Sequence, residues 1–249
     1  MFQRLAAQII AGDVTPIIPE MARVVVRLAH CGVFQVGGVL VGTIAYQILG
    51  PHLGVVWEDS SLITQDVDLA GNATRVAVAV PNLTADVPAA FDSLQRGIFP
   101  VPNLSHKEPS TSYGVRSKAL RIDLLTPARR DAAAPFLIHR LNAAAKQLNY
   151  LDYQIESPIN AVMLAGTPCL VKVPQPARYA LHKMVISQAR DATFAAKARK
   201  DLFQAKNMIM QLKEDRPGDL ELAKVALAER GTSWLEKVER ACRQGGIEL

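Results

Sequence analysis

The pattern of apolar and polar positions predicts a mixed first part of the chain and a helical second part. Residues 3–10 and 19–29 carry helical spacing, the latter with apolar side chains at i, i+3, i+4 and i+7 from Met21. Residues 33–41 are apolar throughout, which predicts a strand buried on both faces. A helix is expected over residues 43–49, closed by Gly50 and Pro51.

A spacer follows over residues 53–63, with a short strand as one option at 55–57. Residues 66–69 and 121–125 place acidic side chains between apolar ones, the pattern of half-buried strands. Residues 75–80 fit a strand or a loop. The remaining expectations for this part are a helix over 85–95, loops or an irregular hairpin over 97–117, a mostly helical stretch over 131–148, and a hairpin of 160–164 with 169–173.

The composition changes at Pro174–Pro176, beyond which helix formers dominate. Pro176 suits the first position of a helix. We therefore expect a first domain of residues 1–174 and a helical C-terminal domain of residues 175–249.

Bulk properties exclude some classes of protein. The 249 residues are 49% hydrophobic and 20% charged, as in a globular protein, and the net charge of +5 permits an anionic substrate without requiring one. Three separated cysteines without a Cys-x-x-Cys motif indicate a cytoplasmic protein with no disulfide or zinc site. The uncharged run between Arg27 and Glu58 could span a bilayer, but its Gln, His, Pro and Gly residues favour a buried strand and helix.

Asp66 and Asp68 are the first candidates for catalysis. At positions i and i+2 of a strand, their carboxylates share one face, where a cation such as Mg²⁺ would relieve their repulsion. Asp123 adds a third carboxylate on a second strand. Two-metal nucleotidyl transfer requires such a set, whereas the alternative is acidic residues at ordinary solvated strand ends.

Two further groups could bind phosphate. Gly42 and Thr43 form a turn into a helix, which would offer backbone N–H groups to a phosphate or serve only as an ordinary helix start. Lys183 and Arg190 lie seven residues apart on nearly one helix face, either toward a triphosphate or toward solvent. Asp201 is expected to pair with Lys197 at i, i+4, or to turn toward the site.

In order along the chain, these motifs resemble the DNA polymerase β-like nucleotidyltransferase superfamily. The resemblance covers residues 36–212 and rests on LVGTIAYQILG, TQDVDLA, RIDLLT and the run VPQPARYALHKMVISQAR…KARKDLFQA. The last run is similar to a bacterial branch of unknown substrate, distantly like the abortive-infection toxin nucleotidyltransferases.

The resemblance implies an α+β fold with a mixed, twisted sheet, flanking helices and a helical C-terminal part. It implies metal binding by Asp66, Asp68 and Asp123, with two Mg²⁺ or alternatively Mn²⁺, and phosphate binding by Gly42 and Thr43. Lys183 and Asp201 match further active-site positions of the toxin relatives. Two departures are a longer gap between Gly42 and Asp66, which implies an insertion at 53–63, and Gly-Thr in place of Gly-Ser or Gly-Gly.

We therefore expect a Mg²⁺-dependent nucleotidyltransferase. It would move a nucleoside monophosphate from an NTP such as ATP to an acceptor hydroxyl or phosphate on RNA, protein or a small molecule, releasing pyrophosphate. The first alternative is a non-catalytic nucleotide-binding protein or toxin component with an antitoxin-like partner. A membrane-anchored protein is the weaker alternative.

Overall fold

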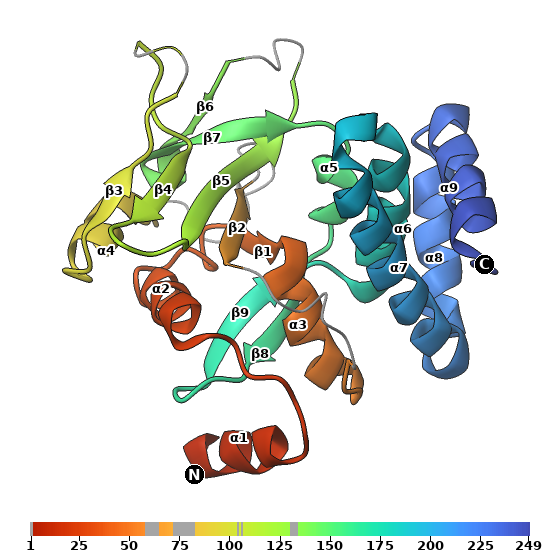
Figure 1. Cartoon of the computed structure of the whole chain (residues 1–249), viewed down its shortest axis with the longest axis horizontal. Coiled ribbons are helices and arrows are strands. Elements are labelled where there is room, and N and C mark those ends of the chain that lie inside the picture. Colours follow the sequence, from red (N-terminus) through yellow and green to blue (C-terminus); the bar gives the residue numbers. More distant parts are fainter. Residues whose placement is uncertain (1, 58–64, 72–82, 104, 106, 130–133) are drawn as a thin grey trace. The chain divides into compact units, whose positions relative to one another are not determined.

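The computed structural model describes residues 2–57, 65–71, 83–103, 105, 107–129 and 134–249. The chain divides into two compact units, Met1–Val173 and Pro174–Leu249. The first unit combines helices with a mixed sheet, and the second consists of helices (Figure 1). The predicted α+β class with a mixed sheet is confirmed.

Two helices open the first unit as predicted, α1 (Phe2–Ala11) and α2 (Pro19–His30). The strand that follows, β1 (Gly38–Val41), is shorter than the predicted 33–41. Gly32 and Gly37 adopt positive φ angles of 87° and 94°, and the Gly38 N–H bonds the Val33 carbonyl at 2.8 Å. These turns bury the apolar residues before β1 without extending the strand.

The main sheet has the order β1-β2-β5-β4-β3, with β7 beside the second half of β5 and β6 beside β7 (Figure 1). Strand β5 runs parallel to β2 and β7, and the other neighbours are antiparallel. The predicted acidic strands are confirmed as β2 and β5. The strands after β1 are β2 (Asp66–Gly71), β3 (Ile98–Pro100), β4 (Ser112–Val115), β5 (Arg121–Pro127), β6 (Phe136–Ile138) and β7 (Ala143–Leu148).

The mostly helical prediction for residues 131–148 is wrong over its described part. The chain forms β6, the 3₁₀ turn η3 (His139–Leu141) and β7. Three consecutive alanines, 143–145, suggest a helix by propensity, but all three are buried and pair with β6, so tertiary packing overrides that preference.

The hairpin predicted within residues 97–117 is confirmed by β3 and β4. Helix α4 (Val87–Asp92) is shorter than the predicted 85–95 because it starts at a cap, where the Asp86 carboxylate accepts the Ala89 N–H at 2.9 Å. The option of a strand or loop at 75–80 lies outside the described residues.

Helix α3 (Gly42–Leu53) passes through Pro51 and ends at Gly54, which has a φ of 78°, so the predicted closure at Gly50 and Pro51 is wrong. The strand option at 55–57 is wrong too. Instead, Trp57 folds back and stacks on Tyr46, with ring centroids 4.7 Å apart, and its Nε1–H donates to the Tyr46 carbonyl at 2.9 Å. A Cβ at Gly50 would lie 2.5 Å from the Trp57 Nε1, so glycine is needed there.

Strands β8 (Ile159–Met163) and β9 (Cys169–Val173) form the predicted hairpin, separate from the main sheet. Its buried face carries Ala161, Met163, Val171 and Val173. The short helix α5 (Leu151–Gln154) joins a buried cluster with the sheet residues Val39, Val41, Ala70 and Leu125. Because Ala70 and Leu125 each follow an acidic residue of their strand at i+2, this cluster packs on the same face of the sheet as Asp68 and Asp123.

The second unit contains α6 (Pro176–Ala189), α7 (Ala195–Asp215), α8 (Pro217–Ala228) and α9 (Thr232–Gly245), in blue shades in Figure 1. Pro176 begins α6 as predicted, and the Gln175 side chain accepts the Arg178 N–H at 2.8 Å. No helix within the described residues is both long enough and apolar enough to cross a membrane. Residues 28–57 of the uncharged run form the end of α2, turns, β1, α3 and the irregular segment 55–57.

Candidate active site

The parallel pairing of β2 with β5 brings the predicted acids together. Their register sets Asp68 beside Asp123 and Asp66 beside Arg121. The intervening Val67 and Ile122 are fully buried on the opposite face. Because side chains alternate along a strand, Asp66, Asp68 and Asp123 share the more exposed face of the sheet.

Gly42 lies directly against this acidic face. It begins α3 with a φ of 68°, and the preceding Val41 pairs with Asp68 across β1 and β2. A Cβ at Gly42 would overlap Oδ2 of Asp68, so only glycine permits the carboxylate to lie there. The N-terminus of α3 thus meets an anionic group, an arrangement that the helix dipole favours.

Thr43 is the second residue of α3 and is half-buried. Val41 holds the cap position and makes no side-chain capping hydrogen bond, so Thr43 lies inside the first turn of the helix. The hydroxyl and backbone N–H of Thr43 remain candidates for phosphate binding, in keeping with their place at the start of a helix.

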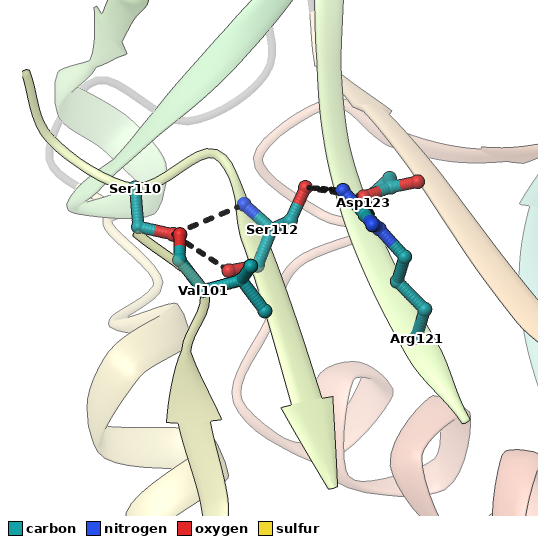
Figure 2. Close-up of polar contacts among 5 residues, drawn as sticks. All are labelled: Val101, Ser110, Ser112, Arg121 and Asp123. Carbon is teal, nitrogen blue, oxygen red and sulfur yellow. Dashed lines mark hydrogen bonds and ion pairs between the residues drawn. The ribbon is translucent and has the colours of Figure 1, made fainter. Parts of the chain in front are cut away.

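Arg121 is the site residue that the sequence reasoning missed. Its Nε donates to Oδ1 of Asp123 at 2.9 Å, and its Nη2 donates to the Ser112 hydroxyl at 3.0 Å (Figure 2). The Ser112 hydroxyl in turn donates to Oδ1 of Asp123. The available signal was the Arg-x-Asp spacing, which places both side chains on one face of a strand.

The charge around Arg121 confirms that the acids surround it. The hydrogen bond to Asp123 raises the pKa of Arg121, and the negative charges of Asp123, Asp66 and Asp68 add to the shift. The guanidinium is therefore a positive charge that interacts with all three carboxylates of the acidic face.

The donor set fits a hard divalent cation. Three carboxylates on adjacent strands supply the oxygen ligands that Mg²⁺ prefers. In the part of the chain that the structure describes, however, no three His, Cys, Asp or Glu side chains already converge as a metal cluster. Asp123 is instead bonded through Oδ1 to Arg121 and Ser112.

The second unit gathers the other predicted residues into one buried cluster. The Lys183 Nζ lies 2.6 Å from Oδ1 of Asp201, and the Arg190 Nη2 lies 2.7 Å from Oδ2. The side chains of Lys183 and Asp201 are only 8% and 4% exposed. The expected pairing of Asp201 with Lys197 is wrong, because Asp201 faces the interior between α6 and α7 while Lys197 is exposed.

Burial and charge act in opposite directions on Asp201. Burial alone would raise the pKa of its carboxyl group, but the charges and hydrogen bonds of Lys183 and Arg190 outweigh burial and lower it. His182, on the same turn of α6 as Lys183, is buried, and its Nδ1 has no hydrogen-bond partner within the described residues. Burial, together with the Lys183 charge, lowers the pKa of His182 to about 3, so the imidazole is neutral at pH 7.

Comparisons with known proteins give one family match. No curated protein matches the chain. Among solved structures, an antigenic nucleotidyltransferase-like protein from Paracoccidioides brasiliensis is 14% identical, with 90% of this chain and 95% of that chain covered and a TM-score of 0.40. A family model described as nucleotidyltransferase matches residues 19–228. Because that match spans most of the sequence, the chain belongs to this nucleotidyltransferase family.

Proposed function

We propose that this protein is a Mg²⁺-dependent nucleotidyltransferase. It transfers a nucleoside monophosphate from an NTP to an acceptor hydroxyl or phosphate and releases pyrophosphate. The observation that carries the proposal is the register of β2 and β5, which sets Asp68 beside Asp123, with Gly42 against the Asp68 carboxylate. Family membership supports the class of reaction.

Each residue of the acidic face has a distinct task in this reaction. Asp66 and Asp68 would hold the divalent ions, and Asp123 would hold the ion nearest the acceptor. Bound Mg²⁺ supplies activation of the acceptor oxygen and neutralises charge on the triphosphate. The N–H groups at Gly42 and Thr43 would orient phosphate oxygens at the start of α3. Val67 and Ile122, buried behind the acids, keep the two strands in register.

The buried cluster of the second unit carries an excess of positive charge. Lys183 and Arg190 share a single anionic partner, Asp201, so this cluster carries one more positive than negative charge when His182 is neutral. Such an excess suits an anionic substrate such as a triphosphate. Asp201 would hold both cations in fixed positions rather than act on the substrate itself.

Transfer of label tests the proposal. Each of the four NTPs, labelled at the α-phosphate, is incubated with Mg²⁺ and either RNA, protein or small-molecule acceptors. Wild type is compared with Asp68→Asn and with Asp92→Asn, which removes an exposed carboxylate on α4. We expect transfer by wild type and Asp92→Asn and background label with Asp68→Asn. Equal transfer by all three proteins would contradict the assignment of the site.

The alternative is a nucleotide-binding protein without turnover, such as a toxin component controlled by an antitoxin-like partner. The hydrogen bonds from Arg121 and Ser112 to Asp123 support this alternative. They occupy one oxygen of a carboxylate that metal-dependent transfer would need as a ligand. Calorimetry separates the two. Mg²⁺-dependent NTP binding that is lost in Asp68→Asn, without transfer to any acceptor tested, would identify the binding-only form.

A further inference from the structure

Arg121 lies where a cation is needed on the acidic face. It is the register partner of Asp66, and its Nε donates to Oδ1 of Asp123, which in turn lies beside Asp68. Three carboxylates that share one face repel one another, and a guanidinium among them offsets part of that repulsion. Arg121 therefore serves the acids in the way that a bound cation would.

The contacts of Arg121 hold only one oxygen of Asp123. Both Arg121 and Ser112 bond Oδ1, and no hydrogen bond or ion pair among the described residues reaches Oδ2. Ser112 is itself fixed, because it pairs with Asp123 across β4 and β5 and its carbonyl lies 2.6 Å from the Ser110 hydroxyl (Figure 2). The hydrogen-bonded group of Ser112, Arg121 and Asp123 is thus held in one defined arrangement.

The same geometry leaves Arg121 able to move. Its backbone N–H is bonded to the Gln65 carbonyl at 2.9 Å, which anchors the main chain, while its side chain is 52% exposed. Asp123 is more enclosed, with its side chain 27% exposed. A half-exposed arginine can rotate into water at small cost, so the guanidinium is the partner that would leave.

Resting on the proposed function, we propose that Arg121 is a resident counterion of the acidic face that competes with the divalent cation for Asp123. With no metal bound, its guanidinium balances Asp66, Asp68 and Asp123 and holds Oδ1. A divalent ion held by Asp123 would lie close to the guanidinium, and the two positive charges would repel each other, so metal binding favours withdrawal of the guanidinium from Oδ1. Arg121 is thus a positioning residue that lowers the affinity for free metal.

The effect of removing Arg121 on metal affinity has opposite signs for a supporting and a competing role. If Arg121 only supported Asp123, its loss would weaken metal binding. If it competes, its loss strengthens metal binding, because the negative potential of the acidic face is no longer offset. Couplings between two ligands at one protein typically span about 5-fold to 150-fold in affinity, which sets the expected range.

The test measures binding of Mn²⁺ alone, by calorimetry and by electron paramagnetic resonance of the free ion, without nucleotide. Arg121→Gln removes the charge, Arg121→Lys keeps it without the forked donor group, and Arg4→Gln removes an equal charge from the exposed face of α1. Asp68→Asn shows which binding belongs to the site. We expect Arg121→Gln to bind Mn²⁺ at least about 5-fold tighter than wild type, with Arg4→Gln unchanged and Arg121→Lys between them.

Folding is followed in parallel, so that a failed variant does not hide the result. Without metal, Arg121→Gln should unfold at a lower temperature than wild type, and Mn²⁺ should raise its unfolding temperature more than that of wild type. Asp68-dependent binding that is unchanged or weaker in Arg121→Gln would overturn the counterion role and leave the proposed function standing. Absence of Asp68-dependent binding in wild type would instead overturn the metal site and both proposals.

Discussion

The Cα of Gly42 lies against the carboxylate of Asp68, so closely that a side chain at position 42 would overlap Oδ2. The glycine that opens α3 and the second acid of β2 therefore form one structural unit. Val41, the residue before Gly42, pairs with Asp68 across the strands and fixes this approach. The spacing of the two motifs in sequence gives no indication of such contact.

Gly42→Ala should therefore damage the site and the fold together. The new methyl group would displace the Asp68 carboxylate, and a φ of 68° is unfavourable for alanine. We expect the free energy of unfolding to fall by about 1–3 kcal/mol, with loss of Asp68-dependent Mn²⁺ binding. Urea unfolding and calorimetry measure the two effects. Gly166→Ala is the matched control, because a Cβ there meets no atom within 4 Å; equal effects of both variants would contradict the argument.

Asp201→Asn tests the buried cluster of the second unit. The change leaves Lys183 and Arg190 without a negative partner, and Lys183 is almost fully buried. Removing one partner of a buried ion pair typically costs about 3–5 kcal/mol. Unfolding in urea should show a loss of this size. Asp191→Asn, which removes an exposed carboxylate near α6, should stay within about 0.5 kcal/mol of wild type.

The buried His182 predicts a dependence of stability on pH. Its pKa is lowered from 6.5 to about 3, so between these values the unfolded chain binds a proton that the folded protein does not. Stability linked to His182 is therefore present above pH 6.5 and is lost as the pH falls toward 3. Between pH 6.5 and 5 the loss should reach about 2 kcal/mol at most.

His182→Leu isolates this effect from the other titrating groups. Urea unfolding from pH 7 to 4 should give a shallower pH dependence for the variant than for wild type. Protonation of the Asp201 carboxylate changes the free energy of unfolding only at lower pH, because the pKa of Asp201 in the folded protein lies below the ordinary value of 3.8. Parallel curves for the two proteins would show that His182 is accessible to protons in the folded state.

Trp57→Ala tests how residues 55–57 are attached to α3. The substitution removes the stack on Tyr46 and the hydrogen bond to its carbonyl. These two interactions together predict a loss of about 1–3 kcal/mol in the free energy of unfolding. Trp57→Phe keeps a ring but no N–H donor and should lose less. If thermal unfolding of both variants matches wild type, residues 55–57 are not held on α3 in solution.

Local patterns were sufficient where one short-range rule decides the structure. Alternation of acidic and apolar residues identified β2 and β5, and the position of Pro176 identified the start of α6. Local patterns failed where packing decides. The alanines of β7 favour a helix by themselves, and the apolar stretch before β1 has no signal for the turns at Gly32 and Gly37.

In the candidate site, too, local patterns predicted some features and packing decided the others. Sequence alone determined which carboxylates share a face within each strand, because side chains alternate with a period of two. Only the tertiary structure set Asp68 beside Asp123, since the register between strands distant in sequence depends on how both pack on the core. It also decided that Asp201 bonds Lys183 and Arg190 rather than Lys197, and that Arg121 bonds Asp123. Such partnerships depend on which faces become buried, and burial is a property of the folded chain as a whole.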